Sequence, residues 1–204
     1  VYKRQLEHSK WENRHTLESK HFIFSYTIDP DIMERWADLM DAYYDAFSKY
    51  WGGLRRPSGF PKLDVKFFHS QEYFNQFNAQ SGSDGRGTLG FFRFVPPLEL
   101  NIFYHRLDEN LTRTTMYHEA NHYLLWLIDP HYRFPNWINE GLAQYYSGAK
   151  WNPKSKKLTV GDVLEGDLAA VKTDIEVGNH VSIKDMQPYS NIPPQYYPWA
   201  WSFV

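Results

Sequence analysis

The segment at residues 115–125, TMYHEANHYLL, constrains the fold of this chain more than any other, because it contains the pattern H-E-x-x-H. In an α-helix His118 and His122 lie on one face, one turn apart, so both imidazoles can reach one metal ion. Glu119 lies beside them, where it can hold the water bound to that metal. The next turn, at 124–128, is apolar nearly all round and indicates a buried helix. A bound metal would explain why paired histidines are buried.

A third ligand is needed, and the chain has no cysteine, so this ligand must be a histidine or a carboxylate. Glu140 lies eighteen residues after His122, in the segment WINEGLAQY at 137–145. A helix, a turn and a second, antiparallel helix fit in that interval and bring Glu140 back beside the histidines. Two histidines and one Glu leave the fourth tetrahedral position open for water, which distinguishes catalytic from structural zinc. The alternative is an exposed Glu in the first turn of a helix, favoured by the helix dipole.

Composition and charge exclude several classes of protein. With 204 residues, 42% hydrophobic and 18% aromatic, the chain is long enough to fold as one domain with a substantial core. Its net charge is −2 and no basic stripe stands out, so we expect no nucleic-acid partner. The longest apolar run, at 123–128, is far too short for a membrane-spanning segment. Nothing in the sequence sets an oligomeric state.

Periodicity and turn residues predict an α+β fold, in the order strand, helix, strand, helix, two strands and then helices. Strands are predicted at 21–28, 63–69, 88–94 and 98–104, with a shorter one at 157–160. Helices are predicted at 31–50, at 71–80 behind a Ser70 cap, at about 138–147, at 162–177 and from Tyr196 onward. The H-E-x-x-H helix is predicted to start near Thr112, Thr114 or Thr115 and to end at about Ile128. A loop is expected at 81–87, and 181–186 is ambiguous. The order of the elements predicts a mixed sheet with an antiparallel edge strand, packed on the metal-binding helix.

The predicted domain organisation is an extended lead-in at 1–20, anchored by Trp11, and a single domain at 21–204. This domain has a sheet half at about 21–128 and a mainly helical half at about 129–204. Val1 is not an initiator Met and the last helix stops without a cap, so we expect the natural protein to continue beyond this chain. A cysteine-free, trimmed chain is compatible with an exported protein, periplasmic or extracellular, but the sequence does not fix the compartment.

The pattern at 118–122 followed by WINEGLA at 137–143 resembles the gluzincin metallopeptidases, the thermolysin and aminopeptidase N clan. In that clan the third zinc ligand is the Glu of an Asn-Glu-Gly-type segment. The resemblance implies that one Zn²⁺ is bound by His118, His122 and Glu140, and that Glu119 is the general base. It also implies an edge strand that holds a peptide or protein substrate in extended form, with 98–104 as its neighbour. The substrate-binding residues on that strand would be Thr88, Leu89, Gly90 and Phe91.

The chain is more closely similar to the peptidase-MA-like families of bacterial proteins of unknown function, over about residues 18–204. Asn139 and Gln144 are the expected neighbours of the ligands. Many relatives have a carboxylate where Gln144 stands, which would accept a hydrogen bond from a ligand histidine; an amide oxygen accepts the same bond without charge. The Gly-x-Met-Glu-Asn segment with which aminopeptidases capture a free N-terminus is replaced by GTLGF at 87–91, which argues against that mode.

These features predict a zinc-dependent hydrolase of peptide bonds, an endopeptidase that uses a metal-activated water. The oxyanion needs a second electrophile, for which Tyr197, Tyr196, Tyr189 and His180 are candidates. In the related families a Tyr near the start of the final helix has this role, which favours Tyr197 among the four; the equal alternative is that Tyr197 only packs. The alternative function is a catalytically weak or inactive binding module. The intact Glu119 argues against this alternative, and the missing charge at Gln144 keeps it open. A metal-free domain would require both motifs to be coincidences.

Overall fold

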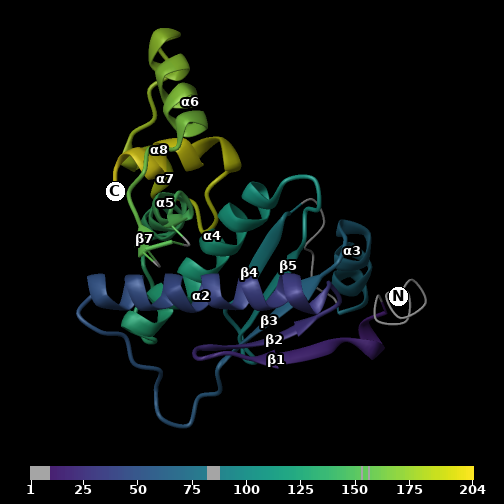
Figure 1. The fold of residues 1–204 in the computed structure, drawn as a ribbon. Coiled ribbons are helices and arrows are strands. Elements are labelled where there is room, and N and C mark those ends of the chain that lie inside the picture. The colour runs from purple at the N-terminus through teal and green to yellow at the C-terminus, as the bar shows by residue number, and fades with distance from the viewer. Residues whose placement is uncertain (1–9, 82–87, 153, 156) are drawn as a thin grey trace.

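The structure, a computed structural model, describes residues 10–81, 88–152, 154–155 and 157–204. These residues form seven α-helices and a mixed five-stranded sheet, which confirms the predicted α+β class. Figure 1 shows the sheet in one half of the molecule and most of the later helices in the other half. Most of the loop expected at 81–87 lies outside the described residues.

The sheet contains β1 to β5 in the order β1-β2-β3-β5-β4. Its strands are β1 (His15–Glu18), β2 (Phe22–Tyr26), β3 (Leu63–Phe68), β4 (Gly90–Arg93) and β5 (Glu99–Phe103). The three central strands run parallel, while β1 and β4 pair antiparallel at the two edges. The predictions that β4 is an edge strand and β5 its neighbour are therefore confirmed. The sheet begins at β1, whereas residues 1–20 were expected only to lead into it.

The strand register aligns large apolar side chains on the face of the sheet that meets the core. One row consists of Phe24, Val65, Leu100 and Phe92, all of them buried. The next row contains Tyr26, Phe67 and Ile102, and it ends on β4 at Gly90. The glycine is the one residue of this row without a side chain, and it lies on the edge strand.

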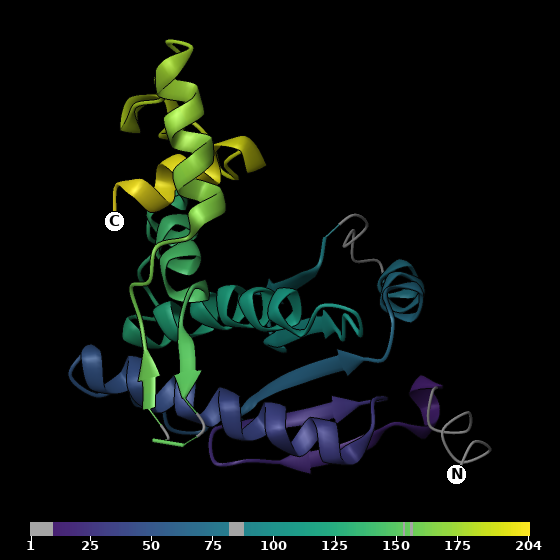
Figure 2. The ribbon, with the colours of Figure 1, turned by 45° about the horizontal axis from the view of Figure 1, so that its top comes forward.

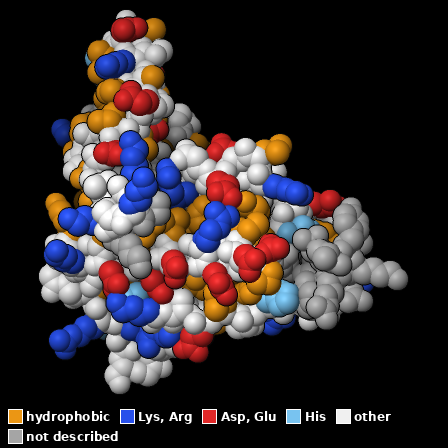
Figure 3. Space-filling model, viewed as in Figure 1, with side chains coloured by type: hydrophobic (Ala, Val, Ile, Leu, Met, Phe, Trp, Pro, Cys, Tyr) orange, Lys and Arg blue, Asp and Glu red, His pale blue; other side chains and the backbone are white. Residues whose placement is uncertain are grey.

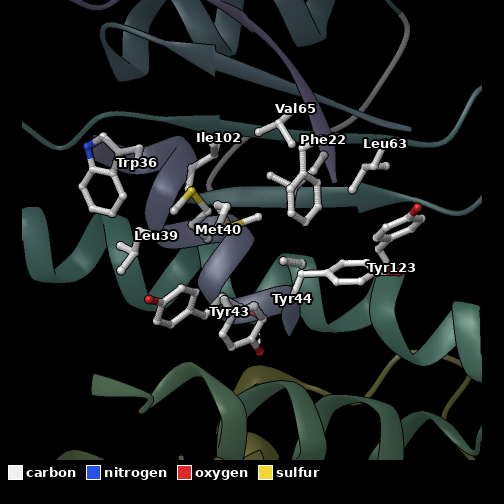
Figure 4. Packing of buried hydrophobic residues seen from close by; sticks show 14 of the residues in the cluster. Phe22, Trp36, Leu39, Met40, Tyr43, Tyr44, Leu63, Val65, Ile102 and Tyr123 are labelled. Carbon is white, nitrogen blue, oxygen red and sulfur yellow. Dashed lines mark hydrogen bonds between the residues drawn. The ribbon is translucent and has the colours of Figure 1, made fainter. Parts of the chain in front are cut away.

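Two long helices cover this face. Helix α2 (Pro30–Tyr50) begins where the Asp29 side chain accepts a hydrogen bond from the Asp31 amide, and it confirms the helix predicted at 31–50. Figure 4 shows its buried side chains, Met40 among them, packed toward the sheet residues and Tyr123 of the second helix. The second helix, α4 (Glu109–Ile128), carries the H-E-x-x-H pattern and contacts β4 and β5. The predicted packing of this helix on the sheet is thus confirmed.

Helix α4 begins at Glu109, three residues before Thr112, the first of the threonines near which its start was predicted. The N-cap is Asp108, whose side chain accepts a hydrogen bond of 3.0 Å from the Leu111 amide. Thr112 lies inside the helix, where its hydroxyl accepts a hydrogen bond of 2.8 Å from the His105 amide. Both Asp and Thr are good caps, so local propensity did not choose between them. The predicted end at Ile128 is confirmed.

The opposite face of the sheet is covered by α3 (Gln71–Gln80), which Ser70 caps as predicted. Phe74 of α3 is fully buried between this helix and the sheet, beside Phe68 and Phe103. Trp11, in the 3-10 helix η1 (Trp11–Asn13), stacks on Phe68 with ring centroids 4.4 Å apart. The lead-in is therefore anchored by Trp11, as expected.

The second half of the chain is mainly helical. Its elements are α5 (Asn136–Ser147), β6 (Lys150–Asn152), β7 (Lys157–Thr159), α6 (Glu165–Glu176), α7 (Ile183–Met186), η2 (Pro194–Tyr196) and α8 (Tyr197–Ser202). The predictions of α5, α6 and β7 are confirmed with shifted ends; β6, which pairs with β7, was not predicted. The ambiguous segment 181–186 contains the single turn of α7.

A separate small core holds these helices together. It consists of Val171, Val181, Met186, Ile192, Trp199 and Ala200. Figure 2 shows α6 projecting from the rest of the molecule, with α8 crossing its base. Figure 3 shows acidic and basic side chains interspersed on the face seen in Figure 1. Among the described residues, no helix is long and apolar enough to cross a membrane.

Candidate metal centre

Tyr117 and Asn121, which directly precede His118 and His122, anchor α4 to α2. Tyr117 stacks on Tyr43 with ring centroids 4.2 Å apart. The Tyr43 hydroxyl donates a hydrogen bond of 3.2 Å to the Tyr117 carbonyl, and Asn121 donates one of 3.4 Å to that hydroxyl. Tyr43, Tyr117 and Asn121 are completely buried, so they fix the rotation of α4. That rotation sets the direction in which His118 and His122 point.

Helix α5 returns beside α4 and brings Glu140 to both histidines. The Nε2 atom of His118 lies 3.2 Å from Oε2 of Glu140, and Nε2 of His122 lies 3.7 Å from the same oxygen. His118 also lies against Gln144, one turn later in α5. His118, the earlier histidine of α4, meets Gln144, whereas the later His122 meets the earlier Glu140 of α5. This order of contacts shows that the two helices run antiparallel. The predicted return of the chain at Glu140 is confirmed.

The three side chains have the geometry of a metal-binding group. One donor atom from each of His118, His122 and Glu140 lies within 4.8 Å of the other two. A tetrahedral zinc ion with bonds of about 2.0–2.1 Å places its ligand atoms roughly 3.3 Å apart, close to the two separations above. His122 and Glu140 are only 6% and 7% exposed, and a buried carboxylate needs a charged partner or a metal. The donor set therefore fits a metal ion, because imidazole and carboxylate groups are ligands of zinc and of other divalent first-row metals.

The surroundings of His118 and Glu140 shift the pKa values of both side chains in the direction of their charged forms. Burial alone would lower the pKa of His118, but the hydrogen bond to Glu140 and the charges of Glu119 and Glu140 raise it overall. Burial would likewise raise the pKa of Glu140, but the hydrogen bond and the charges of the two histidines lower it overall. Glu140 is therefore held as the carboxylate, the form that binds a cation.

Glu119, the predicted base, lies half-buried on α4 next to the edge strand. A Cβ atom placed on Gly90 would lie 3.4 Å from Cγ of Glu119, 3.1 Å from Cγ2 of Thr115 and 3.0 Å from the Asn101 carbonyl oxygen. Gly90 therefore lets β4 approach α4 at the position of the base. This close approach places the edge strand beside Glu119.

The other residues predicted to bind substrate differ in position. Thr88 and Leu89 are exposed and precede β4. The ring of Phe91 packs toward Phe74 of α3, with centroids 6.0 Å apart, on the face of the sheet away from the triad. Of the four residues, Gly90 is therefore the one whose backbone lies close to Glu119. The Phe91 side chain points toward α3 and away from the triad.

Tyr197, at the start of α8, contacts the triad. Its ring stacks on His118 with centroids 6.0 Å apart. Burial, the charges of Glu140 and Glu119 and a hydrogen bond to Glu140 all raise the pKa of Tyr197, so its hydroxyl stays protonated at neutral pH. Of the alternative candidates, Tyr189 and Tyr196 pack against each other and His180 is exposed.

Gly141 allows α8 to lie close enough for this contact. A Cβ atom on Gly141 would lie 2.5 Å from the carbonyl oxygen of Ala200 and 3.1 Å from Cγ1 of Val204. The glycine after Glu140 is therefore a packing requirement: it brings the helix that carries Tyr197 against the helix that carries the third ligand.

Replacing Gly141 by Ala is expected to lower the free energy of unfolding by about 1–3 kcal/mol, because the new methyl group overlaps backbone atoms. This cost exceeds the roughly 1 kcal/mol that Ala gains over Gly within a helix. The matched control is Gly166→Ala in α6, where a Cβ atom meets nothing within 4 Å. Chemical denaturation should show the control unchanged or stabilised. Equal stability of both variants would contradict the close packing of α5 on α8.

A cavity of about 520 Å³ opens beside His122. Its wall combines polar side chains with the aromatic side chains of Phe94, Trp126, Tyr132, Phe134 and Tyr189. Asn139, an expected neighbour of the ligands, also lines the cavity. The volume is in the range of small-molecule and side-chain pockets. No sequence signal identified this wall, because its residues come from separate segments that only the fold brings together.

Gln144, the other expected neighbour, contacts His118 and also a residue that the sequence did not indicate. Its Oε1 lies 3.2 Å from Nδ1 of His118, and its Nε2 donates a hydrogen bond of 2.8 Å to Oδ2 of Asp167 in α6. Burial raises the pKa of Asp167, while the hydrogen bond from Gln144 and the charge of His118 oppose that rise. A carboxylate is thus present near His118, one side chain further away than in the pattern of the resembling families.

Comparison with known proteins adds no family to these observations. No protein-family model matches the chain, and no curated protein matches it.

Proposed function

We propose that this chain is a zinc-dependent peptidase that cleaves within peptide chains. The observation that carries the proposal is the convergence of His118, His122 and Glu140 on one point, with Glu119 beside them and the edge strand β4 next to Glu119. Three protein ligands leave one tetrahedral position for water, which is the arrangement of catalytic zinc sites. A structural zinc site would instead use four protein ligands.

Each residue of the site has a distinct role in this proposal. When bound, zinc supplies Lewis-acid activation of the water and of the scissile carbonyl group. The Glu119 carboxylate accepts the proton of the attacking water and delivers it to the leaving amide nitrogen. The protonated Tyr197 hydroxyl donates a hydrogen bond to the developing oxyanion. Its contacts with His118 and Glu140 support this role, in which Tyr197 is not a ligand of the metal.

The edge strand and the cavity supply the binding surface for the substrate. The outer edge of β4 has no strand paired with it in the described sheet, so an extended peptide can add to it through main-chain hydrogen bonds. The aromatic wall of the cavity beside His122 suits a large apolar side chain of that peptide. Binding of this kind requires no free terminus, which is why we propose an endopeptidase.

The test is digestion of a mixed peptide library by the zinc-loaded chain, with products identified by mass spectrometry. We expect cuts within peptides, enriched for a large apolar residue next to the cut, and no cuts after chelation of the metal. Tyr197→Phe should cut at least about 10² times more slowly, as expected on loss of an oxyanion donor, while Tyr196→Phe should not. Bound zinc without cleavage would reject the peptidase and favour a binding module.

A further inference from the structure

Three side chains from three helices form a hydrogen-bonded chain that ends at the metal centre. His118 belongs to α4, Gln144 to α5 and Asp167 to the first turn of α6. Gln144 lies between the other two, 3.2 Å from Nδ1 of His118 and 2.8 Å from Oδ2 of Asp167. Asp167 is half-buried, whereas Glu165 in the same turn is exposed. The Asp167 side chain therefore points inward, toward the helices that carry the triad.

The chemistry of these groups fixes the direction of every hydrogen bond in the chain. A carboxylate accepts hydrogen bonds and does not donate them, so the amide nitrogen of Gln144 must face Asp167. The amide oxygen of Gln144 then faces His118 and can only accept, so Nδ1 of His118 must carry a proton. The lone pair of His118 is left on Nε2, the atom that lies 3.2 Å from Glu140 in the triad. Without Asp167, either orientation of the amide would be possible.

We propose that Asp167 is a positioning residue for the metal centre: acting through Gln144, it fixes the tautomer and ring orientation of His118 that bind the metal. The inference rests on the metal site of the proposed function but not on peptidase activity. It also assigns a role to α6, whose sequence carries no recognisable motif. The resembling families have a carboxylate at position 144, in direct contact with the histidine. In this chain the carboxylate of Asp167 takes that role, with the Gln144 side chain between it and His118.

The test is the zinc affinity of the purified full chain, measured by competition with a chromogenic chelator. Asp167→Asn keeps the shape of the side chain but removes the charge that orients the amide, and Asp167→Ala removes the contact. Loss of a partner that orients a metal ligand typically weakens metal binding about 10- to 100-fold, and we expect a loss of that size in both variants. Glu165→Gln is the matched control: it removes one charge from the same helical turn and should leave the affinity within about twofold.

A double variant separates positioning from mere stabilisation of the fold. Combining Gln144→Glu with Asp167→Asn exchanges the carboxylate and the amide, so that the new carboxylate accepts from His118 directly and the new amide donates to it. We expect this exchange to restore most of the affinity that Asp167→Asn loses. Wild-type affinity in both single Asp167 variants would overturn the proposal, and so would a loss that the exchange does not restore.

The same measurements distinguish this proposal from the proposed function. A wild-type chain that binds zinc but cleaves no peptide would reject the peptidase and leave the role of Asp167 in metal binding intact. Normal zinc affinity in the Asp167 variants, together with cleavage by the wild type, would overturn only the role of Asp167. The Co²⁺-substituted protein gives a second readout, because its visible spectrum reports the geometry of the ligands: it should change in Asp167→Asn and not in Glu165→Gln.

Discussion

Glu119→Gln is expected to lower peptide hydrolysis by about 10²–10⁴-fold while leaving zinc binding unchanged, because an amide of the same shape cannot accept the proton of the attacking water. Glu119 is not a member of the metal-binding group, and its Cγ atom faces Gly90 of the edge strand. The substitution therefore removes a proton acceptor without removing a ligand. The rate of cleavage of a fluorogenic peptide and the zinc content of the same sample measure the two effects separately.

The control for this variant is Glu109→Gln, in the exposed first turn of the same helix. The Glu109 side chain is 49% exposed and lies outside the triad, so its loss should leave turnover within a small factor of the wild type. Turnover by Glu119→Gln at the wild-type rate would remove Glu119 from the reaction. Loss of zinc from this variant would instead show that Glu119 supports the ligands.

The second large effect is expected at Glu140. Glu140→Ala should weaken zinc binding by more than about 100-fold, since even the loss of a partner behind a ligand costs 10- to 100-fold. Oε2 of Glu140 lies near Nε2 of both His118 and His122, so no other described carboxylate is placed to replace it within this group. The two histidines alone make a weaker, more open site.

Glu140→Gln is the companion variant, because it keeps the size of the buried side chain while removing its charge. Both Glu140 variants should lose zinc, whereas Glu176→Ala, an exposed acidic residue at the end of α6, should retain it. Isothermal titration with zinc at fixed pH measures all three. Wild-type affinity in both Glu140 variants would mean that the metal is held elsewhere or that Glu140 is only a hydrogen-bond partner.

Local patterns predicted the parts of the centre that lie within one helix or at a fixed interval along the chain. The spacing of His118 and His122 follows from helical periodicity, and the interval to Glu140 fits two antiparallel helices. The apolar periodicity of α2 likewise predicted a helix whose bounds are close to Pro30–Tyr50. These features depend on short-range geometry, which the sequence encodes directly.

Features that depend on the packing of distant segments were not predictable in this way. Asp167 lies on a helix without a motif, and only the docking of α6 brings it to Gln144. Strand β1 alternates between exposed and half-buried side chains at the sheet edge, so its four residues carry little apolar signal. Gly141 appeared as part of a motif, but the reason for a glycine there belongs to the packing of α8. The Ala200 carbonyl oxygen lies 2.5 Å from the point that a Cβ atom of residue 141 would occupy.

The relation of Gln144 to the resembling families changes once Asp167 is considered. From the sequence alone, an amide at this position removed a charge from behind the ligand histidine and kept an inactive binding module as an alternative. The structure shows a carboxylate behind this amide, because Gln144 donates a hydrogen bond of 2.8 Å to Asp167. The amide then relays the orientation of the carboxylate to His118, which supports the proposal of a functional metal centre.

The most direct test of the metal centre is the metal content of the wild-type chain. The protein would be loaded with excess zinc, dialysed extensively and analysed by elemental mass spectrometry alongside a His118→Ala/His122→Ala double variant. Three converging ligands predict about one zinc ion per chain in the wild type and nearly none in the double variant. A wild-type chain that retains no metal, or a double variant that retains as much as the wild type, would show that His118, His122 and Glu140 do not form a metal site.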